Sequence, residues 1–420
     1  MKKIKLGEIC KVTSSKRIFE KEYVATGIPF IRGQEISNDS ISFDDNFDCY
    51  ISYERYTELA NKYGIPQKND ILITAVGTIG NLYIVQDNRK FYFKDGNIIW
   101  IRNIDNSVSP KFLKYFMQSP VFKKQIQHAL IGAVQKALTI EMLSKIEIEL
   151  PPLSEQKKIG AFLYSLDEKI SLNKKINATL EAMAKTLYDY WFVQFDFPDE
   201  NGKPYKSSGG KMIFNAELGR EIPEGWQVGK LSEFGNLKNG INYDKNTIGD
   251  ALIKIVNVKD ISASSLAIAI ESLENIKLPS KQIKKYLTSD EDILIARSGI
   301  PGAVRILAGK NVPVIYCGFI ICLKLFDKSY KNYLIFNLQK NYEIILTQSA
   351  GTIMQNVTQE TLKKLQLAMP PATILKNFNL IINQIISEMQ KNLLENFKLS
   401  ELRDFLLPLL MNGQVGFKED

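Results

Sequence analysis

The alternation of apolar and polar residues divides the 420-residue chain into two kinds of segment. Short runs of alternating character, separated by turn-forming residues, are typical of β-strands and open each half of the chain. Two long segments, 153–193 and 372–416, instead repeat their apolar residues every three to four positions, as amphipathic helices do. The sequence therefore predicts an α+β (mixed α/β) protein in which each of two sheet domains is followed by a long helix.

The two halves of the chain repeat one another in the same order. DILITAVGTIG at 70–80 matches DILIARSGIPG at 292–302, and GAVQKALTIEMLSKIEIELPP at 132–152 matches GTIMQNVTQETLKKLQLAMPP at 351–371. PFIRGQEIS at 29–37 shares its acid-Ile-Ser ending with IKIVNVKDIS at 253–262. The offset stays at about 220 residues throughout, which indicates a tandem duplication.

Pro-Pro pairs mark where each sheet domain ends, because proline cannot continue a strand ladder. They stand at 151–152 and 370–371, directly before the two helical segments. The predicted organisation is a first domain (1–152), a first helix (153–193), a linker (194–225), a second domain (226–371) and a second helix (372–416).

Both helical segments carry a heptad seam over about five heptads, and the first helix would be about 60 Å long. The first seam consists of Ile159, Leu163, Leu166, Ile170, Asn173, Asn177, Leu180, Ala184, Leu187 and Trp191. The second consists of Phe378, Ile382, Ile385, Met389, Asn392, Asn396, Leu399, Arg403, Leu406 and Leu410. Only Arg403 interrupts the pattern, and its alkyl stem can lie along an apolar face.

The paired asparagines suggest how the two helices meet. Each helix either packs on its own domain or pairs with the other in an antiparallel coiled coil under a pseudo-two-fold axis. In the second arrangement Asn173 faces Asn396 and Asn177 faces Asn392, so that buried amides satisfy one another and fix the register.

A further apolar set, Ile176, Met183 and Tyr190, lies beside the seam of the first helix. An apolar face wider than one partner helix requires is a candidate docking surface for another protein. Contact with the chain's own flanking domains is the alternative.

The composition narrows the class of function. Lys and Arg exceed Asp and Glu by 54 to 46, for a net charge of +8, which is compatible with a polyanion partner. Four cysteines without a C-x-x-C pair, and the single His128 in a helix rich in Lys and Gln, argue against a zinc site, a disulfide framework or a histidine-based triad. The start has no secretory h-region, and the longest apolar stretch, 312–326, is too short and too interrupted to span a bilayer. We expect a cytoplasmic protein.

Motifs for nucleotide or methyl-transfer chemistry are missing from the sequence. It contains no Walker A motif, no Asn/Asp-Pro-Pro-Tyr/Phe motif and no H-E-x-x-H or H-x-E…C-x-x-C pattern. The glycines of DILITAVGTIG lack the Lys-Ser/Thr that a phosphate loop requires, so we interpret them as a tight turn at a strand end.

These segments together resemble the specificity subunits of Type I restriction-modification systems. The Pro-Pro-Leu-x-Glu-Gln opening at Pro151–Gln156 and the Trp-Phe-Val ending at Trp191–Val193 resemble that family's first conserved region. ELGREIPEGWQVGKLSEFG at 217–235 is similar to the linker by which the family enters its second target-recognition domain. The resemblance covers essentially the whole chain. The second conserved region, MPPATILKNFN, departs from it by lacking Glu-Gln, so one local contact of that repeat is expected to differ.

The resemblance implies a division of labour. Two target-recognition domains each read one half of a split, asymmetric double-stranded DNA site, and the conserved helices act as the spacer. Two modification subunits, which use S-adenosylmethionine to methylate adenine, dock on the helices, and ATP-driven restriction subunits join them. The chain itself is then a non-catalytic subunit that binds no cofactor, since S-adenosylmethionine, ATP and Mg belong to the partner subunits.

Candidate DNA contacts are the polar and basic loop residues that can hold phosphates or read base edges. In the first half they are Thr13, Ser14, Ser15, Lys16, Arg17, Arg32, Gln34, Thr78, Gln135 and Lys136. In the second half they are Lys238, Asn242, Lys245, Lys259, Arg297, Ser298, Gln355 and Asn356. Ala75-Val76 in one half matches Arg297-Ser298 in the other, so unequal half-sites are expected, separated by about one turn of DNA as in two-fold readers.

Three other functions compete with this one. A stand-alone nuclease or methyltransferase would act on DNA by itself, whereas a protein scaffold would bind peptides and show no sequence-dependent DNA binding. An inactive or phase-variable copy would retain the fold.

Overall fold

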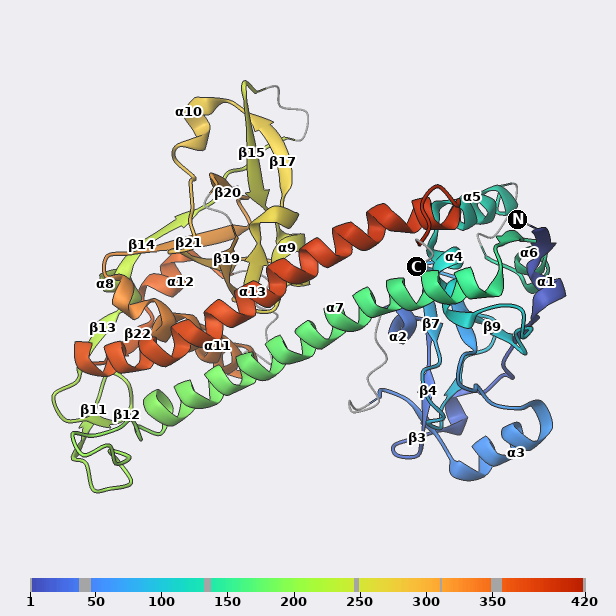
Figure 1. The fold of residues 1–420 in the computed structure, drawn as a ribbon. Coiled ribbons are helices and arrows are strands. Elements are labelled where there is room, and N and C mark those ends of the chain that lie inside the picture. Colours follow the sequence, from blue (N-terminus) through green and yellow to red (C-terminus); the bar gives the residue numbers. More distant parts are fainter. Residues whose placement is uncertain are drawn as a thin grey trace. The chain divides into compact units, whose positions relative to one another are not determined.

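The computed structural model describes residues 2–37, 47–131, 137–244, 249–309, 312–348 and 357–417 (Figure 1). The chain forms two compact units, residues 1–168 with 400–420 and residues 169–399. The long helices α7 (Leu153–Tyr188) and α13 (Ala372–Met411) each contribute one part to each unit, and a π-helical turn, Asp189–Val193, continues α7. The boundaries between the units therefore fall inside the two long helices, whereas the sequence predicts each helix as a segment separate from the domains.

The first unit contains two four-stranded sheets, ordered β2-β9-β6-β7 and β3-β5-β4-β8, and the strand pair β1-β10. All neighbours are antiparallel except β4 and β8. The strands are β1 (Lys2–Lys5), β2 (Lys11–Ser14), β3 (Tyr23–Val24), β4 (Ile28–Ile31), β5 (Tyr50–Ile51), β6 (Ile71–Thr74), β7 (Leu82–Ile84), β8 (Tyr92–Phe93), β9 (Ile98–Arg102) and β10 (Glu147–Leu150). The helices are α1 (Leu6–Ile9), α2 (Gly33–Ser37), α3 (Tyr53–Tyr63), α4 (Pro110–Gln118), α5 (Pro120–Ala129) and α6 (Ile140–Ser144).

The second unit has a five-stranded sheet, β14-β21-β18-β19-β16, a three-stranded sheet, β17-β15-β20, and the pairs β13-β22 and β11-β12. The strands are β11 (Met212–Asn215), β12 (Arg220–Pro223), β13 (Gln227–Lys230), β14 (Gly235–Asn239), β15 (Ala251–Val256), β16 (Ala267–Ala269), β17 (Glu274–Leu278), β18 (Ile293–Ala296), β19 (Val304–Ala308), β20 (Val314–Tyr316), β21 (Ile320–Leu325) and β22 (Gln366–Met369). The helices are α8 (Leu231–Phe234), α9 (Val258–Ala263), α10 (Ser280–Ile283), α11 (Lys331–Gln348) and α12 (Gln359–Lys363).

The strand pairing of the first unit is repeated in the second. Ile71 opposite Ile101 in the β6–β9 ladder corresponds to Ile293 opposite Leu323 in the β18–β21 ladder. The parallel pair β4–β8 corresponds to β15–β20, and β1–β10 corresponds to β13–β22. The duplication that the sequence predicts therefore extends to the hydrogen bonding of the sheets. The edge strand β16 has no counterpart among the described strands of the first unit.

Both long helices supply side chains to the core of the first unit. Ile159 and Leu163 of α7, together with Leu407 and Leu410 of α13, are buried with the sheet and α4. The close approach of α7 to α4 requires glycine at Gly160, because an added Cβ would lie 2.8 Å from a backbone nitrogen of α4. Burial of this kind, at about 25 cal/mol per Å² of apolar surface, is the main force that holds the helix parts to the domain.

The Pro-Pro-Leu-x-Glu-Gln motif has a specific structural role. The buried Gln156 accepts a hydrogen bond from the Ser109 backbone N–H, where α4 begins, and donates to the carbonyls of Pro151 and Ser107. In the second repeat, Asn379 donates to the carbonyl of Ser329, the residue that corresponds to Ser107. The missing Gln is thus replaced by an amide one helical turn later, and the local contact differs as expected.

The Trp-Phe-Val ending of the first conserved region anchors an aromatic cluster in the second unit. Phe192 lies edge-on to Phe378 of α13, with ring centroids 4.8 Å apart, and close to Trp226. Such pairs add about 0.5–1.5 kcal/mol beyond their buried area. The predicted linker, 194–225, is not featureless, since it contains the β11–β12 hairpin.

None of the helices in the described part of the chain combines the length and apolarity of a membrane span.

Candidate nucleic-acid interface

One edge of the first unit gathers the candidate loops; we call it the first rim, formed by 14–17, 32–34, 75–80 and 94–97. Backbone hydrogen bonds hold it together: Ala75 N–H donates to the Asn97 carbonyl (2.7 Å) and Lys94 N–H to the Ile31 carbonyl (2.9 Å). Leu138 N–H donates to the Ala75 carbonyl (2.8 Å). The ends of β4, β6 and β8 therefore meet at one place.

The second unit repeats these bonds at the second rim, formed by 240–242, 257–259, 297–302 and 317–319. Arg297 N–H donates to the Phe319 carbonyl (2.8 Å), Cys317 N–H to the Val256 carbonyl (3.0 Å) and Val357 N–H to the Arg297 carbonyl (3.1 Å). Each bond has its counterpart in the first rim at an offset of about 220 residues. The two rims thus share one backbone arrangement while their side chains differ.

The glycines of both G-x-x-G motifs form strand-end turns, as the sequence predicts. Gly77, Gly80, Gly299 and Gly302 have φ values of 70°, 94°, 80° and 83°, a region that favours glycine. Each turn comes directly after a buried strand, β6 or β18. Thr78 is exposed at the tip of the first turn.

The candidate segment Thr13–Arg17 is only partly available to a ligand. Thr13 and Ser14 donate their hydroxyls to the carbonyls of Trp100 and Ile98 across the β2–β9 pair, and Ser15 is buried. The exposed Lys16 ammonium lies over the Tyr63 ring, and the exposed Arg17 guanidinium pairs with Asp95 at 3.2 Å. Lys16 and Arg17 are therefore the residues of this segment whose charged groups are exposed to a ligand.

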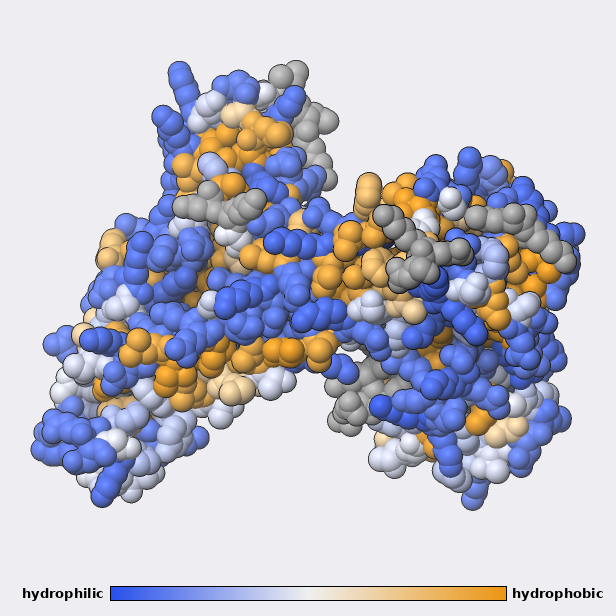
Figure 2. Space-filling model, viewed as in Figure 1, coloured by the Kyte–Doolittle hydropathy of each residue, from blue (hydrophilic) through white to orange (hydrophobic). Residues whose placement is uncertain are grey.

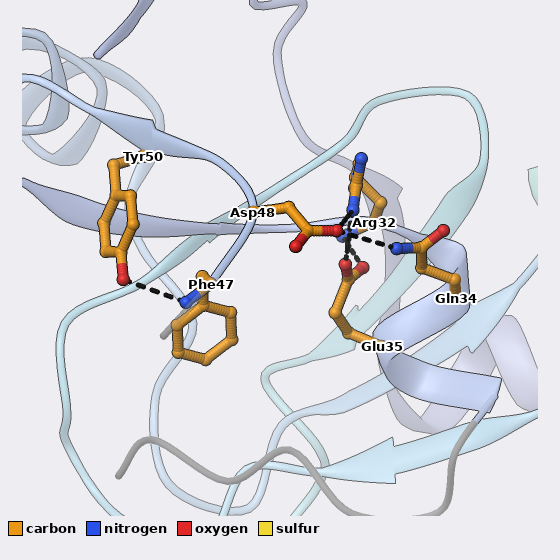
Figure 3. Close-up of polar contacts among 6 residues, drawn as sticks. All are labelled: Arg32, Gln34, Glu35, Phe47, Asp48 and Tyr50. Carbon is orange, nitrogen blue, oxygen red and sulfur yellow. Dashed lines mark hydrogen bonds and ion pairs between the residues drawn. The ribbon is translucent and has the colours of Figure 1, made fainter. Parts of the chain in front are cut away.

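Arg32 and Gln34 share a carboxylate that no sequence motif singles out (Figure 3). Asp48 accepts hydrogen bonds from Nη2 of Arg32 (2.7 Å) and Nε2 of Gln34 (3.3 Å), and the same Nη2 also donates to Glu35 (2.9 Å). Burial alone would lower the pKa of Arg32, but the hydrogen bonds to Glu35 and Asp48 raise it above its ordinary value. The guanidinium is thus fixed between two acids.

In the second rim, Lys259 is in a similar position. Its ammonium pairs with Glu274 at 2.8 Å, and this hydrogen bond raises the pKa of Lys259 above its ordinary value. Asn257 occupies the place of Arg32: its backbone N–H donates to Asp260 (2.7 Å), as that of Arg32 does to Glu35 (2.7 Å). The shared acid-Ile-Ser ending in the sequence marks this equivalence.

Other candidates of the second half are used within the fold. Nη1 of Arg297 donates to the Gly318 carbonyl (3.0 Å), which supports the β20–β21 turn, and Ser298 is half-buried. Nζ of Lys238 donates to the Lys285 carbonyl (2.6 Å), whereas Asn242 is exposed. Gln135, Lys136, Lys245, Gln355 and Asn356 lie outside the described residues.

Three further residues, two beside the rims and one within the second rim, were not among the sequence candidates. Asp48 and Glu274 hold the candidate side chains, and Phe319 exposes 58% of its surface at the turn that matches Asn97. No periodicity marks the two acids, because their positions depend on strand pairing. Phe319 belongs to the apolar stretch 312–326, in which hydrophobicity alone does not single out one exposed residue.

The asparagine pairs of α7 and α13 lie within the second unit. Nδ2 of Asn173 is 3.0 Å from Oδ1 of Asn396, and Nδ2 of Asn392 is 3.0 Å from Oδ1 of Asn177. Asn177 also donates to the Met389 carbonyl (2.9 Å). The helices run antiparallel at this contact.

Arg403 does not merely lay its stem along an apolar face. In the first unit its guanidinium binds Asp167 at 2.8 Å, and Asp167 also accepts from Tyr115 (2.6 Å) and Lys114 (3.2 Å). Burial would raise the pKa of Asp167, but these three partners outweigh it and hold the pKa below its ordinary value. A charge network thus replaces one seam contact.

The apolar set beside the α7 seam is exposed in the second unit. Ile176, Met183 and Tyr190 expose 38%, 55% and 37% of their surface, and Leu172 extends the set with 52%. Figure 2 shows apolar residues gathered along this part of α7. In the described part of the second unit, each of these side chains keeps more than a third of its surface exposed.

Comparisons with known proteins bear on this geometry. The family model described as the Type I restriction modification DNA specificity domain matches residues 1–182 and 223–403, one match per repeat. The MjaIX specificity subunit of Methanocaldococcus jannaschii is 27% identical over all of this chain and 94% of its own length. The HindI specificity subunit of Haemophilus influenzae is 24% identical over 86% of this chain and 91% of its own.

A solved structure agrees with the fold. The Type I restriction-modification S subunit from M. genitalium matches with a TM-score of 0.58 at 13% identity, covering 100% of this chain and 96% of its own. The chain belongs to the family of Type I restriction-modification specificity subunits. Within that family it is a DNA-recognition component and not a catalytic one.

Proposed function

We propose that this chain reads a bipartite, asymmetric double-stranded DNA site, with one rim for each half-site. The observation that carries the proposal is the pair of rims: the same backbone bonds present Arg32, Gln34 and Asn97 in one unit, and Asn257, Lys259 and Phe319 in the other. Because base edges are read by side chains, unequal side chains on equal backbones imply unequal half-sites.

Phosphate contacts would hold each unit on the duplex. The exposed Lys16 and Arg17 in the first unit, and the exposed Lys238 beside the second rim, are suited to this role, since cations that neutralise phosphates release counterions. The net charge of +8 agrees with such binding. Five candidates that lie outside the described residues remain predictions of the same kind: Gln135, Lys136, Lys245, Gln355 and Asn356.

The long helices would form an antiparallel coiled coil that separates the half-sites. The Asn173–Asn396 and Asn177–Asn392 contacts support this pairing, because buried amides fix register. The repeat itself is the reason to expect a pseudo-two-fold relation between the halves.

Partner subunits would supply the chemistry. The exposed apolar face of Ile176, Met183 and Tyr190 supports docking of a modification subunit on α7. Two such subunits would bring S-adenosylmethionine, and restriction subunits would bring ATP and Mg, so that this chain needs no cofactor of its own.

Sequencing of methylated adenines in a host that expresses this chain with its modification subunit tests the proposal. We expect a single split motif whose two halves are not inverted copies of each other. A palindromic motif, or methylation by the modification subunit without this chain, would contradict it. Insertion of one heptad into both helices should lengthen the gap and leave both half-sites unchanged.

A further inference from the structure

Two matched positions at the rims each carry a side chain held by a carboxylate. Gln34 lies in the first turn of α2 and Lys259 in the first turn of α9, and the acid-Ile-Ser repeat aligns them. Gln34 is held by Asp48 and Lys259 by Glu274. All four side chains are exposed, so the pairs lie on the surface rather than in a core.

The two carboxylates come from neighbouring places in the topology, one residue apart in strand register. Asp48 directly precedes the residues that pair with β4, since Phe30 N–H donates to the Cys49 carbonyl (3.0 Å). Glu274 begins β17 and lies opposite Ile255 of β15, the strand that corresponds to β4. In both units the antiparallel neighbour therefore starts at the rim, where it can reach the helix.

Asp48 is fixed at both sides along the chain. Phe47 N–H donates to the Tyr50 hydroxyl at 2.9 Å (Figure 3), and the Cys49 carbonyl is held by the bond from Phe30 N–H. The Arg32 guanidinium, bound by Glu35, holds one Asp48 oxygen at 2.7 Å. The carboxylate that meets Gln34 is thus set by three separate contacts.

Charge argues against phosphate as the ligand of either position. Among the described residues, the hydrogen-bonded group around Gln34 contains one cation, Arg32, and two acids, Glu35 and Asp48, so the charge of this group is negative. The Lys259–Glu274 pair is neutral as a whole. Phosphate binding depends on net positive charge, whereas base edges are read by directed hydrogen bonds.

The carboxylate also fixes the polarity of the Gln34 amide. An ionised carboxylate only accepts, so the NH₂ group must face Asp48, which leaves the second N–H and Oε1 of this exposed side chain available to a ligand. One donor beside one acceptor matches N7 and N6–H₂ of adenine. Lys259 has two N–H groups left after binding Glu274, which match the two acceptors O6 and N7 of guanine.

We propose that Gln34 and Lys259 are base-reading residues at equivalent positions of the two half-sites, Gln34 for an adenine and Lys259 for a guanine. Asp48 and Glu274 are positioning residues that orient them, and Arg32 holds Asp48 in place. This inference rests on the proposed function, because it assigns the bases read by the same two rims.

The test is the methylated motif of a host that expresses the modification subunit with full-length variants of this chain. Gln34→Ala should make one adenine position of one half-site degenerate, and Lys259→Ala one guanine position of the other, each without effect on the opposite half-site. Asn61→Ala on α3 and Lys211→Ala, which removes another exposed Lys–Glu pair, are matched controls that should leave the motif unchanged.

The possible outcomes distinguish a failure of the proposed function from a failure of this inference. A wild-type chain that yields no split motif overturns the proposed function itself. A split motif that Gln34→Ala and Lys259→Ala leave unaltered, or alter at a base other than adenine and guanine, overturns only the inference. If Gln34→Ala abolishes methylation, Asp48→Ala decides, since it keeps Gln34 but releases its amide. It must then relax one adenine position of one half-site, and an unchanged motif would overturn the assignment.

Discussion

The side-chain amide of Asn173, completely buried in the second unit, donates to Oδ1 of Asn396 across two antiparallel helices at 3.0 Å. The same amide donates to Glu395 (2.7 Å), whose carboxylate also pairs with Lys169. These polar contacts interrupt an otherwise apolar seam. Because an unsatisfied buried amide is costly, they favour one register of the two helices over its neighbours.

Asn173→Ala should destabilise the second unit by about 1–3 kcal/mol, because Asn396 is left without its donor in a buried place. Replacing both residues by leucine should cost less than the single change, since no polar group is then stranded. Urea unfolding of the wild type, Asn173→Leu, Asn396→Leu and the double leucine variant measures the coupling, with Asn173→Ala measured beside them. The exposed Lys175→Ala is the control, and a loss for Asn173→Ala no larger than for that variant would contradict the argument.

Asp167 should make the first unit sensitive to acid. Its pKa is held below the ordinary value in the folded protein by Lys114, Tyr115 and Arg403, so its stabilising effect is complete above the unfolded pKa of about 4 and is lost as pH falls through the folded value. Asp167→Asn should cost about 1–3 kcal/mol at pH 7 and should flatten the fall in stability below about pH 4. Thermal melts of both proteins between about pH 7 and about pH 3 test this.

Asp404 supplies the control for that experiment, since it binds the same arginine but is more exposed. Asp404→Asn should leave the acid transition nearly unchanged, because exposed pairs contribute about 0–1 kcal/mol. Equal effects of the two substitutions would show that Asp167 has no special role.

Much of the fold could be predicted from the sequence because duplication and periodicity are local signals. The D-I-L-I motifs predict the matching strands β6 and β18, and the heptad seams place Asn173 opposite Asn396. The glycine turn at the end of each of these two strands could also be predicted, since few other residues suit a turn with positive φ.

The electrostatic partners could not be predicted in this way. Asp48 reaches Arg32 only because β5 pairs with β4, and Asp167 meets Arg403 only at the register the helices adopt. Likewise Asn379 takes over the contact of Gln156 from a position one turn later, which no motif match reveals. Such partners depend on three-dimensional proximity between residues that no repeat relates.

The glycine turns of the two rims should respond differently to the same substitution. Gly80→Ala should cost about 1–2 kcal/mol, the strain of a positive φ, because an added Cβ there meets no described atom within 4 Å. Gly302→Ala should cost more, since the Cβ would lie 1.9 Å from the Tyr342 ring. Chemical denaturation of both variants measures the difference, and Tyr342→Ala should remove the excess from Gly302→Ala. Equal losses for the two glycine variants would show that the ring moves aside freely.

The exposed face of α7 should be needed for assembly but not for folding. Met183→Glu places a charge in the centre of the apolar set and should weaken binding of the modification subunit at least about tenfold, because a desolvated charge is costly at an interface. The thermal melt should stay unchanged, since Met183 is more than half exposed. Ala178→Glu, also exposed but on the opposite side of the helix, is the matched control. Co-purification and calorimetric titration of the two variants with the modification subunit should separate them. Equal affinity for both would mean that the partner docks elsewhere on this chain.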